Sequence, residues 1–202
     1  MKKSAFMLIL CISLIFCTTG CKSKVQSLKL SEIKDETFLL RSDGSVQSAS
    51  YEEFEKYYYR EEELKEFMAD IMEDYNERNG EKSVKLTKFD LEKVNGKDIA
   101  KAIFSYKDLA SYCEMNGIAA AIYTMEEAKQ AGVLPTTFTN AADGSKIDQN
   151  AATKDSDFNV LVIQVKADVI LPDSVKYYSN AMLLSSNSVE TTGEEAAVIV
   201  YK

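Results

Sequence analysis

Residues 158–172 of the chain are FNVLVIQVKADVILP, and two stretches of similar character follow, YYSNAMLLS at 177–185 and AAVIVYK at 196–202. Short, nearly continuous apolar runs bounded by turn-forming residues are typical of strands that are covered on both faces of a sheet. We therefore expect these three stretches to form central strands, around which the rest of the fold is organised.

Two dipeptides upstream of this region are typical of tight hairpins. Asn95-Gly96 joins residues 83–94 to residues 97–106, and Asn-Gly is preferred where both central positions of a turn need positive φ. The apolar residues of the first of these strands change parity along its length, so we expect a β-bulge near Thr87-Lys88. Asp43-Gly44 predicts a second, shorter hairpin by the same argument.

A long helix is expected between the two hairpins. Ser50 and Glu53 have the spacing of a capping box, which predicts a helix that begins at this point. Apolar residues then recur every three or four positions until Asn79-Gly80, which is a typical helix end. The apolar pattern lapses at Glu61–Glu63, so the helix is expected to bend or break near Tyr59-Arg60.

This expected helix is strongly acidic. Residues 51–79 contain eleven Asp and Glu against four Lys and Arg, which leaves a net charge of −7. One face has to bury the apolar residues, so most of the acids must share the outer face. That face is expected either to keep the protein soluble or to dock a basic partner. Its possible interaction surface comprises the tyrosine run and three acids: Tyr57, Tyr58, Tyr59, Glu62, Glu66 and Glu73.

The remaining elements are short. Helices are expected over residues 105–117 and 124–132, the second opened by the capping box Thr124 to Glu127. Residues 118–123 are expected to form a buried strand, and residues 136–157 a long polar loop that is functional or disordered. The predicted fold class is α+β, with a mostly antiparallel sheet, one long or broken acidic amphipathic helix and two short helices.

Composition limits the classes of function. The chain has 202 residues, of which 46% are hydrophobic and 28% charged, as expected for one folded domain. Its net charge of −8 argues against nucleic acid as a partner, because that binding depends on basic clusters that neutralise phosphates.

The sequence offers no catalytic or metal-binding constellation. Histidine, the commonest general base and metal ligand, does not occur in the chain. Cys113, which lacks such a base, is expected to be a buried structural thiol. The acids of residues 136–157 do not have the spacing of a calcium-binding loop, so they are expected to stabilise turns and helix ends. We therefore assign no catalytic residue, metal ligand or cofactor.

The amino terminus has the pattern of a secretion signal. Lys2 and Lys3 precede the apolar run of residues 5–16, which is too short to span a bilayer as a helix. Thr18-Thr19-Gly20-Cys21 follows and resembles the lipobox of bacterial lipoproteins, with threonine at residue 18 where that family usually has leucine. The resemblance implies cleavage between Gly20 and Cys21, and attachment of a diacylglyceryl group to the Cys21 sulfur.

The resemblance also implies a location and a layout. The chain is similar to the small lipid-anchored proteins of Gram-positive bacteria, with a signal peptide over residues 1–20, a lipid-anchored tether over 21–36 and a single extracytoplasmic domain over 37–202. The protein is then expected on the outer face of the cell membrane. A non-enzymatic binding or accessory role at the envelope, toward a basic protein or a glycan, is the favoured function. The alternative is a cell-wall or glycan hydrolase that uses a pair of carboxylates.

Overall fold

The computed structural model describes residues 26–54 and 60–202. The predicted signal peptide, Gly20, Cys21 and the three tyrosines Tyr57, Tyr58 and Tyr59 lie outside the described residues. Within the described ranges, no helix has the length and apolar character needed to cross a membrane.

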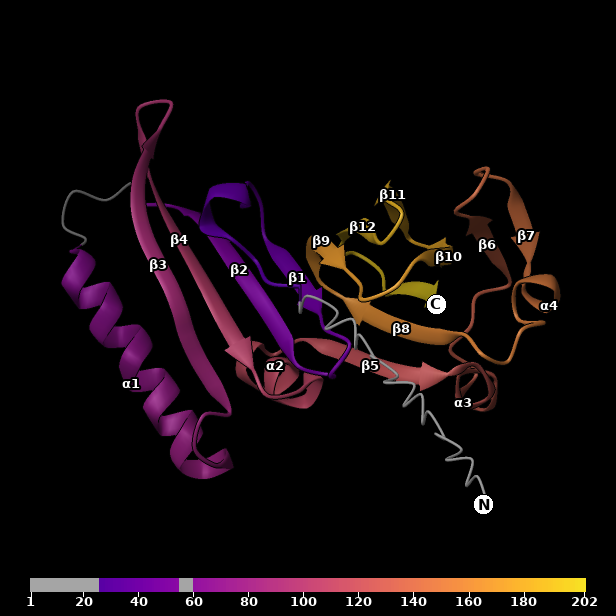
Figure 1. The fold of residues 1–202 in the computed structure, drawn as a ribbon, viewed down its shortest axis with the longest axis horizontal. Helices are drawn as coiled ribbons and strands as arrows, with labels where there is room; N and C mark the ends of the chain where they lie inside the picture. The colour runs from indigo at the N-terminus through magenta and orange to yellow at the C-terminus, as the bar shows by residue number, and fades with distance from the viewer. Residues whose placement is uncertain (1–25, 55–59) are drawn as a thin grey trace, which may run out of the picture.

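Two sheets form the body of the protein (Figure 1). All strand pairs are antiparallel except β1 with β9. The predicted α+β class with mostly antiparallel pairing is thus confirmed. The seven-stranded sheet has the order β11 (Ala181–Ser185), β12 (Ser188–Thr192), β9 (Lys166–Ile170), β1 (Thr37–Leu40), β2 (Val46–Glu53), β4 (Lys97–Tyr106) and β3 (Val84–Val94). The six-stranded sheet has the order β5 (Ala119–Thr124), β8 (Asn159–Gln164), β13 (Ala197–Tyr201), β10 (Val175–Ser179), β6 (Thr137–Asn140) and β7 (Lys146–Asp148).

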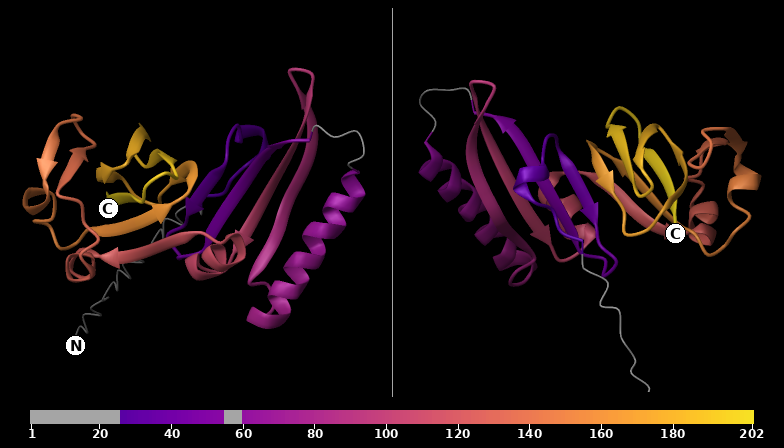
Figure 2. Two further views of the ribbon diagram at one scale, coloured as in Figure 1. Left: turned by 180° about the vertical axis from the view of Figure 1, so that it is seen from behind. Right: turned by 45° about the horizontal axis from the view of Figure 1, so that its top comes forward.

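Two of the helices lie at opposite ends of the molecule. Both views of Figure 2 place α1 beside β3 at one end of the molecule, and β6, β7 and α4 at the other. The described helices are the 3₁₀ turn η1 (Leu30–Glu32), α1 (Glu61–Asn79), α2 (Leu109–Asn116), α3 (Met125–Ala131) and α4 (Gln149–Ala152).

The main core lies between the two sheets. Phe38 and Val169 of one sheet belong to the same buried cluster as Leu161 and Ile199 of the other. Val160 points to the opposite side of β8, where it packs beneath α3. Because β8 is buried on both faces, its sequence is nearly continuously apolar, which confirms the interpretation for this strand. The second half of residues 177–185 is different, because β11 is an edge strand with Met182 and Leu184 exposed.

Two of the three apolar stretches, residues 158–172 and 177–185, cross from one sheet to the other. β8 leads into β9 through the single residue Val165, and β10 leads into β11 through Asn180, which has a φ of 51°. Each stretch therefore contributes to both sheets, and these two corners hold the sheets together at one end. The sequence indicated strands here but not the change of sheet.

A smaller cluster on the outer face of the seven-stranded sheet includes the segment before β1. Leu28 and Ile33 are buried against Leu39, Ala49 and Ile103. The chain is therefore already part of the packed domain at Leu28. These side chains lie within the segment expected to be a tether and cover apolar sheet surface that would otherwise face water.

The Asn95-Gly96 hairpin is confirmed, with positive φ at both residues, 53° and 84°. The predicted bulge is also present, as the register between β3 and β4 shifts between Leu86 and Lys88. The Asp43-Gly44 hairpin forms as well, but only Gly44 has positive φ, at 81°. The turn is thus not the symmetric type in which both central residues have positive φ.

The predicted start of the long helix at Ser50 is wrong. Ser50 lies in β2, where it pairs with Ala102 of β4, and the helix begins only at Glu61, after Arg60. The capping-box pattern is a local signal, whereas pairing with β4 satisfies the backbone groups of the whole segment. Nonlocal pairing overrides the local preference here.

Other local predictions hold in part. Thr124 and Glu127 form the predicted capping box of α3, and Gly132 ends that helix with a φ of 66°. Asp108, rather than Ser105, caps α2 by accepting a hydrogen bond from the Ser111 amide at 2.8 Å. β5 forms as expected, but as a half-exposed strand at the edge of its sheet.

Residues 136–157 do not form a structureless loop. They contain β6, β7 and the short helix α4, with Phe138 and Ala152 buried in a cluster with α3. The segment looks polar in sequence because only these few side chains enter the core, while the turns between them use Asp, Asn and Gly.

Candidate functional site: a groove between α1 and the sheet

The carboxyl-terminal half of α1 is firmly attached to the domain. Tyr75 is only 4% exposed, and its hydroxyl donates a hydrogen bond to Glu114 at 2.9 Å. The Asn76 side chain bonds both backbone groups of Val84, donating at 3.0 Å and accepting at 2.9 Å. These contacts fix the end of the helix against the start of β3.

The amino-terminal half of α1 is packed much less closely. Leu64 and Met68 are half-buried, while Phe67 is 61% and Ile71 39% exposed. The expectation that Leu64, Phe67, Met68, Ile71 and Tyr75 are all buried on one face is therefore wrong for Phe67 and Ile71. Only Tyr75 among the helix residues is fully buried.

Below this half of the helix, the sheet presents short side chains. Ser50, Ala102 and Phe89 are neighbours across β2, β4 and β3, so their side chains point to the same face. Ala100 lies two residues from Ala102 and shares that face. Alanine and serine do not reach far above the sheet, and the helix consequently stands over a hollow instead of a filled interface.

The hollow is a groove of about 460 Å³. Its floor and walls are mainly apolar, and three carboxylates and one guanidinium lie at its margin. The lining residues are Ser50, Glu52, Glu53, Phe54, Arg60, Glu63, Leu64, Phe67, Met68, Phe89, Ala100 and Ala102.

The charged groups at the margin are exposed. Arg60 Nε lies 3.7 Å from Glu63 Oε1, with side chains 75% and 65% exposed. Glu53 pairs with Lys97 of β4. Exposed ion pairs of this kind contribute little to stability, so the margin is not held together by them.

The helix beside the groove is acidic. α1 contains eight Asp and Glu but only two basic residues, Lys65 and Arg78, which leaves a net charge of −6. Lys65 pairs with Glu61 and lies 5.2 Å from the centre of the Phe89 ring. The predicted surface residues Glu62, Glu66 and Glu73 are all exposed on α1.

None of these three acids lines the groove. Glu73 lines a second hollow of about 540 Å³, between α1 and the start of β3, together with Met72, Asn76 and Val84. The groove itself was not predicted. Ala100 and Ala102, two small residues at alternate positions of one strand, were a sequence signal for the groove. The helix that faces them across the hollow is not local in sequence, so the signal could not be interpreted.

Cys113 is half-buried rather than fully buried. Its Sγ lies 3.6 Å from the carbonyl oxygen of Ala120, and the side chain packs against the main core. Burial raises the pKa of the thiol above its ordinary value. This environment is that of a structural cysteine, because a reactive cysteine needs its thiolate favoured.

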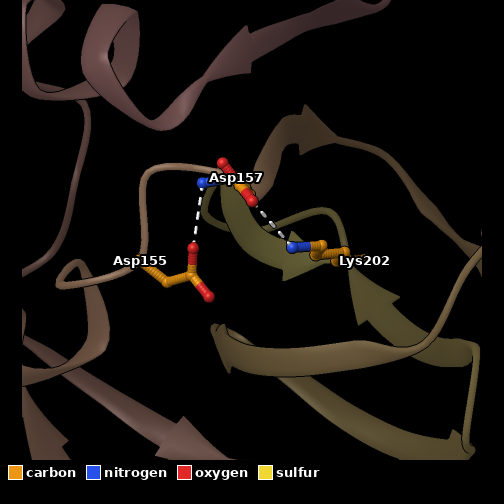
Figure 3. A network of polar contacts seen from close by, with 3 residues as sticks. All are labelled: Asp155, Asp157 and Lys202. Carbon is orange, nitrogen blue, oxygen red and sulfur yellow. Dashed lines mark hydrogen bonds and ion pairs between the residues drawn. The ribbon is translucent and has the colours of Figure 1, made fainter.

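The acids of residues 136–157 stabilise turns, as predicted. Asp155 accepts a hydrogen bond from the Asp157 amide at 3.0 Å, and the Asp157 carboxylate pairs with Lys202 at 3.2 Å (Figure 3). Asp143 accepts from the Ser145 amide, and Asp148 caps α4. In the described part of the chain, no cluster of three or more acidic or cysteine side chains is suited to hold a metal ion.

Two carboxyl groups in the seven-stranded sheet have raised pKa values. Burial is the main cause for both Glu36 and Asp168. Glu36 accepts a hydrogen bond from the Tyr51 amide at 3.0 Å, which partly opposes the rise in its pKa. Neither residue lines the groove, so the candidate site and the perturbed acids are separate features.

No protein-family model, no curated protein and no solved structure matches this chain. The groove is therefore interpreted from its own geometry and chemistry.

Proposed function

We propose that this chain is a lipid-anchored extracytoplasmic protein with a binding role at the cell envelope, and that its partner enters the groove beside α1. The observation that carries the binding role is Phe67, a large aromatic side chain left 61% exposed at the wall of an apolar groove. Exposed apolar surface of this kind typically marks a contact site, because leaving it in water has a cost in free energy.

The anchor is supported by the lipobox-like sequence that ends at Cys21. Two acyl chains hold a protein on a bilayer stably, at roughly 0.8 kcal/mol for each buried methylene. Packing of the domain begins at Leu28, seven residues after Cys21. An extended segment of that length spans at most about 25 Å, so the domain would stay close to the membrane surface.

A carboxylate-pair hydrolase is the second candidate, and one observation favours it: Glu52 and Glu63 line the same groove. In such enzymes the general acid is kept protonated by burial in apolar surroundings. Glu52 and Glu63 are both exposed. Binding is the better-supported role for this reason. Release of soluble fragments from cell-wall glycan, abolished by Glu52→Gln or Glu63→Gln, would favour the hydrolase instead.

The anchor is tested by mass spectrometry of the mature amino terminus from membranes of a Gram-positive host. We expect a chain that begins at a diacylglyceryl-modified Cys21, and a Cys21→Ser variant that carries no lipid. An unmodified Cys21, or cleavage at another bond, would contradict the anchor.

The groove is tested with Nile red, a neutral dye whose emission rises in apolar surroundings. The chain from residue 22 onward is suitable for this, because the buried core begins at Leu28. We expect saturable binding that Phe67→Ser weakens. The control is Met182→Ser, which removes an apolar side chain that is 56% exposed on β11, at the opposite edge of the same sheet. An equal effect of both variants would mean that the dye does not use the groove.

A further inference from the structure

We infer that the groove is the docking site of a basic amphipathic peptide segment, which inserts an apolar side chain against Phe67 and places its cations beside the acids of α1. This rests on the proposed function, in which the groove is a binding site. The arrangement of charge around the exposed aromatic residue supports this inference.

Acidic residues border Phe67 on the helix surface. Residues three and four positions apart are neighbours on an α-helix, so Glu63 and Asp70 lie on either side of Phe67 along the helix. Glu63 also lines the groove. Ile71, 39% exposed, continues the apolar strip by the same spacing. An apolar contact with carboxylates at both ends is the pattern that complements a peptide with alternating apolar and cationic positions.

Most acids of α1 form no ion pair with another described residue. Among the described residues, six acids of α1 take part in no ion pair: Glu62, Glu66, Asp70, Glu73, Asp74 and Glu77. The two basic residues of the helix, Lys65 and Arg78, offset only part of this charge and leave α1 with a net charge of −6. The exposed side of α1 thus carries a negative field that extends about 10 Å at ordinary salt.

This field selects among possible occupants of an apolar groove. A fatty acid or an anionic lipid would bring its negative head group next to Glu52, Glu53 and Glu63 at the margin. A neutral glycan carries no cation to pair with the acids of α1, so their field does not attract it. A cationic peptide gains both from the apolar groove and from the field, which also accelerates its association.

The probe is a fluorescently labelled peptide of about 18 residues, long enough to form a helix, with leucine at helical spacing and lysine elsewhere. A matched peptide carries glutamate in place of every lysine. Binding to the chain from residue 22 onward is measured by fluorescence anisotropy. We expect the lysine peptide to bind at least about tenfold more tightly than the glutamate peptide, and its affinity to fall several-fold between about 50 and 500 mM salt.

Two pairs of variants locate the contact. Phe67→Ser should weaken binding of the lysine peptide by about tenfold, as expected for a central aromatic contact, whereas Met182→Ser should not change it. Glu63→Gln with Asp70→Asn should weaken binding several-fold at low salt and hardly at high salt. Glu194→Gln with Glu195→Gln removes the same charge beside Met182 and should have little effect.

The inference would be overturned by equal binding of both peptides, or by losses confined to the variants near β11. If either of these results is found while Nile red binding still depends on Phe67, the groove remains a binding site and only the basic peptide is rejected. If the unsubstituted chain binds neither the dye nor the lysine peptide, the proposed function is rejected as well. Circular dichroism of each variant establishes that a loss of binding is not a loss of fold.

Discussion

Replacing Gly193 with alanine is expected to destabilise the domain by about 2–5 kcal/mol, because two separate costs add. Gly193 follows β12 and has a φ of 76°, a conformation that costs an L-residue roughly 1–2 kcal/mol. A Cβ atom at this position would also lie 2.8 Å from the Lys166 nitrogen and 3.0 Å from the Val165 carbonyl carbon.

The atoms that a new methyl group would meet belong to the corner at which β8 passes into β9. These atoms belong to the backbone and cannot rotate away as a side chain can. The Gln164 side chain also donates a hydrogen bond to the Gly193 carbonyl oxygen at 3.3 Å, between the same two segments. Overpacking of this kind typically costs about 1–3 kcal/mol. The steric part of the lost stability therefore depends on how closely the turn after β12 approaches the corner between β8 and β9.

Gly44→Ala is the matched control. Gly44 has a φ of 81°, but a Cβ atom there would meet nothing within 4 Å, so only the conformational cost applies. Urea and thermal unfolding of the chain from residue 22 onward should show Gly193→Ala to be the less stable variant by about 1–3 kcal/mol. In a domain of this size, each kcal/mol corresponds to about 2–4 °C in the melting temperature. Equal losses in the two variants would refute the close approach between the turn and the corner.

Three further predictions concern packing, pH and thiol reactivity. Phe138→Ala removes a fully buried ring beneath α3 and should lower the unfolding free energy in urea by about 3–5 kcal/mol. Phe67→Ala, at an exposed position, should lower it by under about 1 kcal/mol. Comparable losses in the two variants would contradict the difference in burial. Burial raises the pKa of Glu36, so the folded state holds that proton more tightly than the unfolded chain does, and the unfolding free energy falls as pH rises through the ordinary glutamate value of 4.5. Glu36→Gln keeps an acceptor for the Tyr51 amide but has no carboxyl group to titrate. The stability of this variant relative to the native chain should therefore improve between about pH 4 and pH 7. A constant difference in stability across that range would be evidence against a buried acid. Alkylation of Cys113 by iodoacetamide should be slower in the folded protein than in denaturant, since burial raises the pKa of the thiol; equal rates would mean that the thiol is not protected.

The sequence by itself determined those features that neighbouring residues decide together. Asn95-Gly96 adopts the predicted turn because few other residues tolerate positive φ at two successive positions. Thr124 and Glu127 form the predicted capping box because the hydrogen bonds involved span only three residues. The change of apolar parity in β3 predicted its bulge for a similar reason, since a strand buries one face at a time.

Only the tertiary structure decided which segments pair and what lies above them. Ser50 has a local pattern typical of a helix start but lies in β2, because β4, distant in sequence, pairs with its backbone. Phe67 belongs to a helical apolar stripe, yet it remains exposed because Ala100 and Ala102 on the facing strands are too short to meet it. Glu62, Glu66 and Glu73 are exposed as their helical positions predicted, while their role as an interaction surface stays a prediction. The groove forms because the side chains of α1 and of the facing sheet do not fill the space between them. These elements are separate in the chain, and the periodicity within either one does not show how they fit together.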